Sequence, residues 1–338
     1  MIRFGVHSGQ QYTRFDDCLA LWTRAEELGY DWVSLFDHQR PPLGGPDGPC
    51  LDGPTLLAAL AARTRRIRCG MLVSAVTWRH PALAASIAAT LDHVSGGRLE
   101  FGVGAGGADL GYDQYGIPFP PAEERLDMLD EACEIMRGLW THERVDHVGK
   151  HYRLVGACLE PKPLQDRLPL VIGGGGEKRT LRTVARHADV WNTLVTDIDT
   201  YRRKQAVLRG YCAEIGRNPD EIRVSMTFRA VLAEDEALVE ERKRERLALL
   251  PAGSSDLSEY LAFGTARQCV EALLPYVRLG VRDFLLGLRP PVDWETMRIF
   301  AEQVAPALRS AADESGPVPW NEGGQVLDQP DPADRVRR

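Results

Sequence analysis

Residues 169–194 read PLVIGGGGEKRTLRTVARHADVWNTL, and this stretch combines a short apolar run, four consecutive glycines and a basic segment with helical spacing. The apolar residues 170–172 are typical of a buried strand. The glycines at 173–176 let the backbone turn tightly and approach a ligand without interference from side chains. A helix over residues 177–187 would direct unpaired backbone N–H groups and its positive dipole end toward that turn. The stretch therefore predicts an anion-binding cradle between a strand and a helix.

Basic residues follow the glycines directly, and Lys178 and Arg179 add positive charge at the mouth of the turn. The turn is not a Walker loop, because a Glu and a Lys stand where that motif requires Gly-Lys-Ser/Thr. From the motif alone, a glycine-rich strand-to-helix turn that binds no ligand is the alternative interpretation.

Strand-like and helix-like segments alternate on both sides of this stretch. The sequence predicts strands over residues 2–6, 32–36, 67–73, 99–103, 170–172, 189–194, 222–230 and 283–288. It predicts helices over residues 15–28, 55–64, 81–94, 121–139, 177–187, 200–215, 265–279 and 292–309. Eight such units favour a closed (β/α)8 TIM barrel of the α/β class over an open doubly wound sheet, which normally has fewer units.

Three segments fall outside this alternation. Residues 141–168 are interpreted as an insertion that carries a short hairpin. A highly charged amphipathic helix lies between residues 232 and 263, where we expect a solvated insertion or lid near the active-site rim. Residues 312–338 contain few apolar and many Pro, Gly and acidic residues, so we expect one domain over residues 1–311 followed by a disordered tail.

The overall composition limits the class of protein. A formal charge of −7 and a pI near 5.7 argue against a nucleic-acid partner, because basic residues are dispersed among acids. No apolar run approaches the roughly 20 residues of a membrane span, and the chain shows no secretory signal, so we expect no membrane association and a cytoplasmic protein. The seven cysteines are scattered without a CxxC pair and are typical of buried thiols.

In a barrel of this kind, function resides at the carboxyl ends of the strands. The predicted strands end at His7-Ser8, Asp37-His38, residues 72–75, 104–107 and 173–176, and Trp191-Asn192. Asp37 and His38 are the strongest polar pair, because a carboxylate and an imidazole can exchange protons near neutral pH. Neighbouring residues on a strand point to opposite faces, so at most one of the two faces the cavity unless the strand has already ended.

Residues 102–107 match the pattern GxGxxG but do not form a dinucleotide fingerprint, since no helix begins within the glycines. These glycines either leave open space for the flat face of a tricyclic ring or allow close backbone packing in a crowded barrel. We predict no metal site, because His142, His147, His151 and Cys158 lie in a polar insertion without zinc-ligand spacing. The sequence also contains no GxSxG elbow, so hydrolysis by that route is unsupported.

Four motifs together resemble a known family. They are SLFDH at residues 34–38, GMLVSAVTWRHPALAASIAATLDHVSGGRLEFGVGAGG at 70–107, YGIPFPPAEER at 115–125 and IGGGGEKRTLRTVARHADVWN at 172–192. Over residues 2–309 the chain resembles the luciferase-like monooxygenase superfamily, and within it the branch of coenzyme F420-dependent oxidoreductases.

The resemblance implies a barrel with an insertion after the fourth strand that binds F420, or alternatively FMN, with the ring at the strand ends. It implies Asp37 and His38 as catalytic residues and a non-prolyl cis peptide bond near Leu72 and Val73. The cofactor-binding residues it implies are Leu72, Val73, Ser74, Gly104, Ala105, Gly106, Gly107, Gly174, Gly175, Gly176 and Lys178. A substrate pocket is expected from His7, Ser8, Asp109, Tyr112 and Trp191, and the family suggests a homodimer.

One position departs from the family pattern. Sugar-phosphate dehydrogenases of this branch carry a proton-donating Glu after the fourth-strand glycines, where this chain has Gly107, and the nearest carboxylate is Asp109. Gly107 leaves a larger space above the ring, so we expect a bulkier substrate than glucose 6-phosphate and His38 as the first candidate for the acid. No basic cluster for a sugar phosphate is evident in the region of the sixth and seventh strands.

The leading hypothesis is an F420-dependent oxidoreductase that transfers hydride between the deazaflavin and a C=C, C=N or C=O group of a small-molecule substrate, with His38 handling the proton. The second hypothesis is a monooxygenase that uses reduced FMN and oxygen. The third is a barrel that binds a flavin without turnover.

Overall fold

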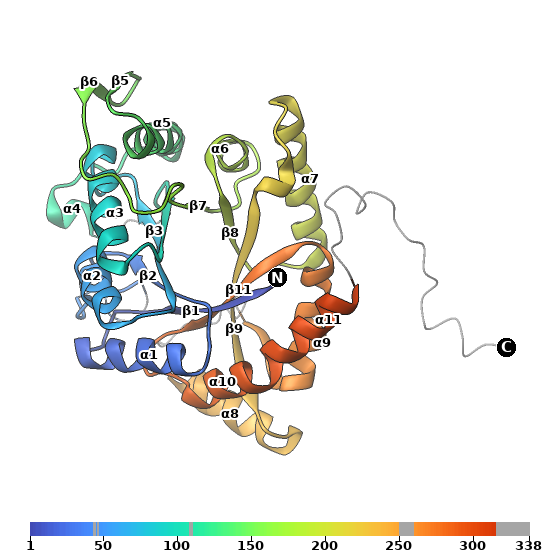
Figure 1. Ribbon diagram of the computed structural model, residues 1–338. Coiled ribbons are helices and arrows are strands. Elements are labelled where there is room, and N and C mark those ends of the chain that lie inside the picture. Colours follow the sequence, from blue (N-terminus) through green and yellow to red (C-terminus); the bar gives the residue numbers. More distant parts are fainter. Residues whose placement is uncertain (43–44, 46, 108–110, 250–259, 316–338) are drawn as a thin grey trace.

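Eight parallel strands close into a barrel in the computed structural model, which describes residues 1–42, 45, 47–107, 111–249 and 260–315 (Figure 1). The barrel strands are β1 (Arg3–Ser8), β2 (Trp32–Asp37), β3 (Arg68–Ala75), β4 (Leu99–Gly104), β7 (Leu170–Gly173), β8 (Val190–Leu194), β9 (Arg223–Ala233) and β11 (Val281–Leu288). Strand β9 pairs with both β8 and β11, and β11 pairs with β1, which closes the sheet. The predicted (β/α)8 TIM barrel is confirmed.

Helices surround the strands on the outside, as Figure 1 shows. They are α1 (Phe15–Glu27), α2 (Gly53–Arg63), α3 (Pro81–Ser95), α5 (Ala122–Thr141), α6 (Thr180–His187), α7 (Ile198–Glu214), α9 (Ala266–Arg278), α10 (Trp294–Ile299) and α11 (Ala305–Ser315), with a π-helical turn, η2 (Phe300–Val304), joining the last two. Their apolar faces pack on the barrel because a helix that buries one stripe needs a sheet or helix to cover it.

Several smaller elements lie outside the barrel strands and the helices that pack on them. The insertion contains the antiparallel hairpin of β5 (Val145–Val148) and β6 (Arg153–Ala157), as predicted. Two further short elements are α4 (Tyr112–Tyr115) and the 3₁₀ turn η1 (Pro219–Glu221). The charged helix α8 (Glu236–Ala248) buries none of its residues, which agrees with the solvated helix expected there. Strand β10 (Tyr260–Thr265) was not predicted; it pairs with the last five residues of β9, outside the ring of eight strands.

Element boundaries differ from the prediction in two informative places. Helix α6 begins at Thr180 rather than at residue 177, because the glycine turn is followed by another turn before the helix starts. At the other end, α11 continues to Ser315, so residues 312–315 of the predicted tail are helical. The remaining tail residues, 316–338, lie outside the described part of the chain.

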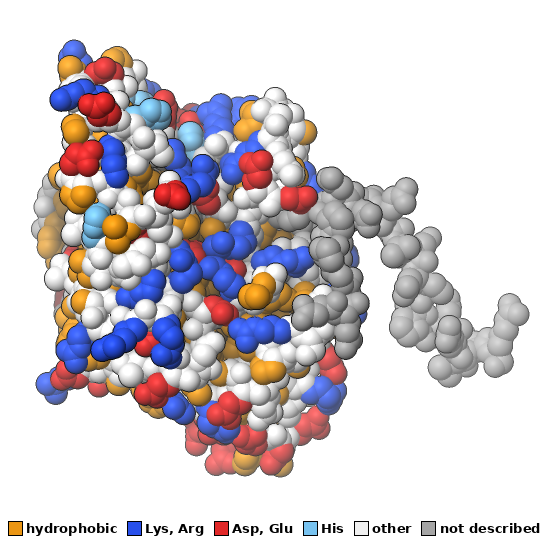
Figure 2. Space-filling model, in the orientation of Figure 1, with side chains coloured by type: hydrophobic (Ala, Val, Ile, Leu, Met, Phe, Trp, Pro, Cys, Tyr) orange, Lys and Arg blue, Asp and Glu red, His pale blue; other side chains and the backbone are white. Residues whose placement is uncertain are grey.

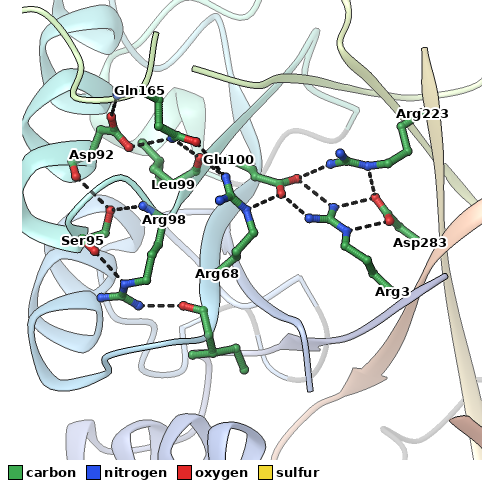
Figure 3. Close-up of polar contacts among 11 residues, drawn as sticks. Arg3, Arg68, Asp92, Ser95, Arg98, Leu99, Glu100, Gln165, Arg223 and Asp283 are labelled. Atoms are coloured by element: carbon green, nitrogen blue, oxygen red, sulfur yellow. Dashed lines mark hydrogen bonds and ion pairs between the residues drawn. The ribbon is translucent and has the colours of Figure 1, made fainter. Parts of the chain in front are cut away.

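A buried ion-pair cluster occupies the amino-terminal end of the barrel (Figure 3). Glu100, only 1% exposed, lies 2.6 Å from Arg3 and 2.8 Å from both Arg68 and Arg223. Asp283 bridges Arg3 and Arg223 at 2.7 and 2.6 Å. Burial by itself raises the pKa of the Glu100 carboxyl, but the three guanidinium groups outweigh it and hold that pKa at about 2. This end of the barrel is therefore closed by charge-assisted hydrogen bonds.

Elsewhere the surface carries mixed charge. Figure 2 shows Lys and Arg side chains across the middle of one face with Asp and Glu side chains among them. Among the cysteines, Cys158 is exposed, Cys50 is half-buried and the other five are buried, in line with the expectation of buried thiols. No helix in the described ranges is both long and apolar enough to cross a membrane.

Candidate active site

A cavity of about 960 Å³ opens at the carboxyl ends of the barrel strands. The residues that line it include ten that the sequence analysis had assigned to the site: His7, His38, Leu72, Val73, Gly104, Ala105, Gly106, Gly107, Gly174 and Gly175. They come from the ends of β1, β2, β3, β4 and β7, so the barrel brings residues more than 160 positions apart in the sequence to one mouth.

One wall of the cavity is an irregularity in β3. The pairing of β3 with β4 skips from Met71 to Ser74, and the peptide bond between Leu72 and Val73 is cis, at the position that the resemblance implied. The Val73 side chain occupies space that two neighbouring strands leave open. A Cβ on Gly104 would lie 2.8 Å from Val73 Cγ2, and one on Gly173 would lie 2.7 Å from Val73 Cγ1. These two glycines are thus required by the packing of Val73.

The glycines after β4 serve a different purpose. Gly106 has a φ of +76°, a conformation that side chains rarely adopt, and it lines the cavity. Among the residues that the structure describes, no atom lies within 4 Å of a Cβ placed on Gly107. The 102–107 glycines therefore differ: Gly104 allows close packing, whereas Gly107 lines the cavity without a described neighbour at its Cβ position.

The predicted anion cradle lies at the cavity wall, but its cation differs from the prediction. Gly174 adopts a φ of +127°, and its N–H donates to the carbonyl of Asn192 at 3.0 Å. A Cβ on Gly175 would lie 2.7 Å from the Nζ of Lys204, which extends from α7. Thr180, the first residue of α6, also lines the cavity. The cradle is thus formed by Gly173–Gly175, Thr180 and Lys204.

The basic residues that directly follow the glycines do not reach this cradle. Lys178 is exposed and, like Gly176, does not line the cavity. Arg179 forms ion pairs with Asp127 at 2.6 Å and Glu123 at 2.7 Å on the neighbouring helix α5. The positive charge at the cradle therefore comes from Lys204. This residue lies on the following helix, and no pattern in the sequence near the glycines indicates that it reaches them.

The side chains of Asp37 and His38 point in opposite directions, as expected for neighbouring residues of a strand. Asp37 is fully buried behind the cavity wall, where it accepts a hydrogen bond from Ser74 Oγ at 2.5 Å and pairs with Arg79. Burial raises the pKa of Asp37 more than Arg79 and Ser74 lower it. His38 lines the cavity and Asp37 does not. Ser74 likewise supports Asp37 rather than facing the cavity.

Two histidines face the cavity in their neutral form. Burial and the nearby Arg289 lower the pKa of His38 to about 4. Burial, with smaller contributions from Arg289 and Arg229, lowers the pKa of His7 to about 3. The Nδ1 atom of His7 lies 2.9 Å from Ser34 Oγ, which orients the ring. Near neutral pH both imidazoles can therefore accept a proton or a hydrogen bond from a ligand.

Three residues expected in the substrate pocket do not line the cavity. Ser8 is buried, donates to the carbonyl of Ser34 and accepts from Trp22 on α1. Tyr112 is buried, stacks on Trp78 with ring centroids 3.9 Å apart and shares a hydrogen bond with Thr77.

Trp191 points out of the barrel, because it alternates with the inward-facing Asn192. Its indole N–H donates to the carbonyl of Gly174 at 2.8 Å, so it supports the cradle from behind. The fifth expected pocket residue, Asp109, lies outside the described residues.

Several cavity residues were missed by the sequence analysis. The guanidinium of Arg125 donates to the carbonyl of Ala105 at 3.2 Å and stacks over the Phe119 ring at 3.9 Å, although the only signal was its place in the 115–125 motif. Arg289 follows β11 and also lines the cavity. Asn192 had been noted only as a strand end; it donates to Ser225 Oγ and Thr227 Oγ1 at 3.1 and 3.2 Å.

Comparison with known proteins shows what the chain is similar to. A family model described as luciferase-like monooxygenase matches residues 1–283. The F420-dependent glucose-6-phosphate dehydrogenase of Microbacterium testaceum is 30% identical over 333 residues, a match that covers 91% of this chain and 98% of the relative. A protein of the same name from Nakamurella multipartita is 29% identical and covers 91% of this chain and 97% of the relative.

Solved structures share the fold. An F420-dependent secondary alcohol dehydrogenase in complex with an F420-acetone adduct superposes with a TM-score of 0.77 at 23% identity, covering 91% of this chain and 99% of the other. A long-chain alkane monooxygenase superposes with a TM-score of 0.77 at 18% identity, covering 92% and 91%. At these identities the likeness establishes the common barrel.

Proposed function

Since the chain belongs to the luciferase-like monooxygenase family, we propose that it is an F420-dependent oxidoreductase, which transfers hydride between a bound deazaflavin and a C=C, C=N or C=O group of an organic substrate. Relatives that match nearly their whole length are named as F420-dependent dehydrogenases. The observation that carries the proposal is the continuous cavity that runs from the glycine cradle to His38.

The residues of this cavity suit a deazaflavin cofactor. The open space at Gly107 and the wall formed by Leu72 and Val73 offer a slot for a flat ring, and no Cβ fills the slot on the Gly107 side. Lys204 and the turn at Gly175 would hold a phosphate, whereas the N–H of Gly174 is already donated to the Asn192 carbonyl. Arg125 and Lys204 add positive charge to a lining that also contains the Asp197 carboxylate, and these two cations would attract the acidic tail of F420. The same phosphate contacts would serve FMN, which therefore has to be distinguished by measurement.

When bound, the deazaflavin accepts or supplies the hydride, and the protein contributes binding, orientation and proton transfer. We assign proton transfer to His38, because its imidazole faces the cavity whereas Asp37 does not. With a pKa near 4, His38 is almost entirely neutral at pH 7, so its imidazole would accept the substrate proton in the oxidation direction and return it in the reduction direction.

The open position at Gly107 supports a substrate larger than glucose 6-phosphate. No atom of a described residue lies within 4 Å of a Cβ placed there, which would let a substrate extend over this edge of the ring. We also propose that the protein is a cytoplasmic homodimer and that its catalytic domain ends near residue 311. Size-exclusion chromatography with light scattering would test the homodimer.

The proposal is tested by titrating the purified protein with F420 and with FMN while following the absorbance or fluorescence of each cofactor. We expect micromolar or tighter binding of F420 and binding of FMN at least ten times weaker. Lys204→Met should weaken F420 binding roughly tenfold, about 1.4 kcal/mol, because one cation at the phosphate is lost. Lys178→Met, a matched change at an exposed lysine away from the cavity, should leave the affinity within twofold. Binding of FMN alone would overturn the proposal.

A further inference from the structure

Asp37 links two features of the active-site cavity. After the bulge at residues 72–73 of β3, the pairing of β2 with β3 resumes with Asp37 opposite Ser74. The hydroxyl of Ser74 donates to Asp37 Oδ2 at 2.5 Å. Residues 72–73 form one wall of the cavity, and His38, which follows Asp37 directly, lines the same cavity. A β-bulge redirects side chains and is often found beside an active site. The placement of the wall and of the imidazole therefore depends on how Asp37 is held.

Arg79 holds the Asp37 carboxylate from the turn between β3 and α3. Its guanidinium forms an ion pair with Asp37, whose side chain is fully buried, and another with Asp52 at 3.3 Å. Asp52 in turn caps α2 by accepting from the backbone N–H of Thr55 at 3.1 Å. The Arg79 side chain is only 19% exposed, so water screens these pairs weakly. One guanidinium thus connects the end of β2, the turn after β3 and the start of α2.

The charge of Asp37 depends on this guanidinium for compensation. Burial raises the pKa of Asp37, while the charge of Arg79 and the hydrogen bonds from Ser74 and Arg79 oppose that rise. Asp52 acts in the same direction as burial. Burial and the two carboxylates also raise the pKa of the neighbouring Cys50 thiol to about 11, so the thiol is uncharged near neutral pH. Among the described residues, Arg79 is the cation that pairs with Asp37, and the second carboxylate oxygen, Oδ1, has no hydrogen-bond partner.

We propose that Arg79 is a positioning residue of the active site, which fixes the His38 imidazole relative to the cavity wall at residues 72–73 by holding Asp37. The proposal rests on the proposed function and adds to it a residue that does not itself line the cavity. A buried carboxylate that loses its ion-pair partner carries an uncompensated charge, which is strongly unfavourable. The end of β2 would then shift until water reaches Asp37, and His38 would shift with it. Misplacement by about 1 Å is enough to impair ring binding and proton transfer.

Two measurements on the full chain follow the two features separately. The affinity for F420 reports on the wall. The rate at which diethyl pyrocarbonate acylates the His38 ring in the cofactor-free protein, measured by mass spectrometry relative to the exposed His142, reports on the imidazole. At about pH 7.5 we expect Arg79→Met to weaken F420 binding at least fivefold and to raise the relative acylation rate of His38 at least threefold. Arg79→Lys, which keeps the positive charge, should show less than half of each change.

Combination with Asp37→Asn shows whether Arg79 acts through Asp37. The amide of Asn has a similar shape, its side-chain oxygen can still accept from Ser74, and it needs no cation. In the Asp37→Asn background, Arg79→Met should therefore change F420 affinity and His38 acylation less than about twofold. If Arg79→Met is unfolded at about pH 7.5, restoration of folding by Asp37→Asn supports the proposal, and failure of both variants to fold overturns it.

The pH dependence provides a further readout that a general loss of structure would not give. Without Arg79, the pKa of Asp37 in the folded protein rises further above the ordinary value of 3.8. The penalty for the buried charge is complete above this raised pKa and shrinks as the pH falls toward 3.8, because the carboxyl then binds a proton. Both measurements on Arg79→Met should therefore return toward wild-type values when the pH is lowered from about 7.5 to about 5.5.

Arg24→Met is the matched control. Arg24 pairs with Glu27 on the surface of α1 at 3.2 Å, so its loss should change either measurement less than about twofold. Wild-type behaviour of Arg79→Met, an equal deficit at both pH values, or an equal deficit with and without Asp37→Asn would each overturn the proposal. Failure of the wild type to bind F420 would instead overturn the proposed function, and the acylation of cofactor-free protein would still decide whether Arg79 positions His38.

Discussion

Replacing Gly104 by alanine tests whether the glycines at the strand ends exist to accommodate Val73. The added Cβ would lie 2.8 Å from Val73 Cγ2, whereas ordinary contacts begin near 3.4 Å, so Val73 must move by about 0.6 Å. Val73 has little freedom to move, because its other γ-methyl group already packs against Gly173 on the opposite side. We therefore expect a steric cost on top of any gain in chain stiffness.

Overpacking of this size costs about 1 to 3 kcal/mol, and the reduced entropy of the unfolded chain returns about 0.5 kcal/mol. The expected net loss in the free energy of unfolding for Gly104→Ala is therefore about 0.5 to 2.5 kcal/mol. In a Val73→Ala background the same substitution should cost less than about 0.5 kcal/mol, because the clashing methyl groups are gone. A coupling energy of about 1 kcal/mol or more should result.

Urea denaturation of the wild type, both single variants and the double variant measures this coupling. Gly107→Ala is the matched control and should change stability by less than about 0.5 kcal/mol, because its Cβ meets no atom within 4 Å in the described part of the chain. If Gly104→Ala proved as harmless as Gly107→Ala, or if Val73→Ala failed to relieve it, the packing explanation for these glycines would be wrong.

Three further predictions concern the support of the cradle, the ion-pair cluster and the proton-transfer residue. Trp191→Phe removes the hydrogen bond from the indole N–H to the Gly174 carbonyl. It should lower the free energy of unfolding by about 1 kcal/mol and weaken F420 binding severalfold. If both values stay unchanged, this hydrogen bond does not support the cradle. Glu100→Gln should cost about 3 kcal/mol at pH 7, because three arginines lose their shared charge. The pKa of the Glu100 carboxyl is lower in the folded protein than in the unfolded chain. Its contribution to the free energy of unfolding is therefore complete above about pH 4.5 and is lost as the pH falls toward 2. The free energies of unfolding of wild type and Glu100→Gln should accordingly converge near pH 2 in acid denaturation. His38→Ala should slow turnover by roughly 10²-fold or more while its affinity for F420 stays within a few fold of wild type. In the wild type, the rate of alcohol oxidation should decline only as the pH falls toward 4. A decline centred near pH 6.5 would contradict a neutral, buried His38.

Periodic features of the sequence predicted the architecture well. Each barrel strand and its helix were found because apolar alternation and helical spacing are local properties of the chain, and the hairpin in residues 141–168 was found for the same reason. Strand β10 was missed; it follows the charged helix and pairs with the extended end of β9, outside the alternation of barrel strands and helices.

Side-chain direction and distant partners limited the prediction of the site. The alternation argument correctly anticipated that only one of Asp37 and His38 faces the cavity, but it was not applied to Trp191 and Asn192, where the inward residue is Asn192. Lys178 was chosen because it closely follows the glycines, and Lys204, which approaches Gly175 from the next helix, was not considered. Contacts of this kind depend on how helices pack around the barrel, which no local pattern encodes.

Oxygen uptake and cofactor oxidation, measured together in one stirred cell, test most directly that hydride passes to or from the deazaflavin without activation of oxygen. The purified protein is supplied in air with reduced F420 and a panel of carbonyl and unsaturated compounds, and in parallel with reduced FMN and the same panel. The account predicts that reduced F420 is oxidised only when an organic acceptor is present, in equal amount to the acceptor consumed, and without enzyme-dependent oxygen uptake. Oxygen consumption that depends on the enzyme, reduced FMN and an organic substrate, with no reaction of reduced F420, would contradict it.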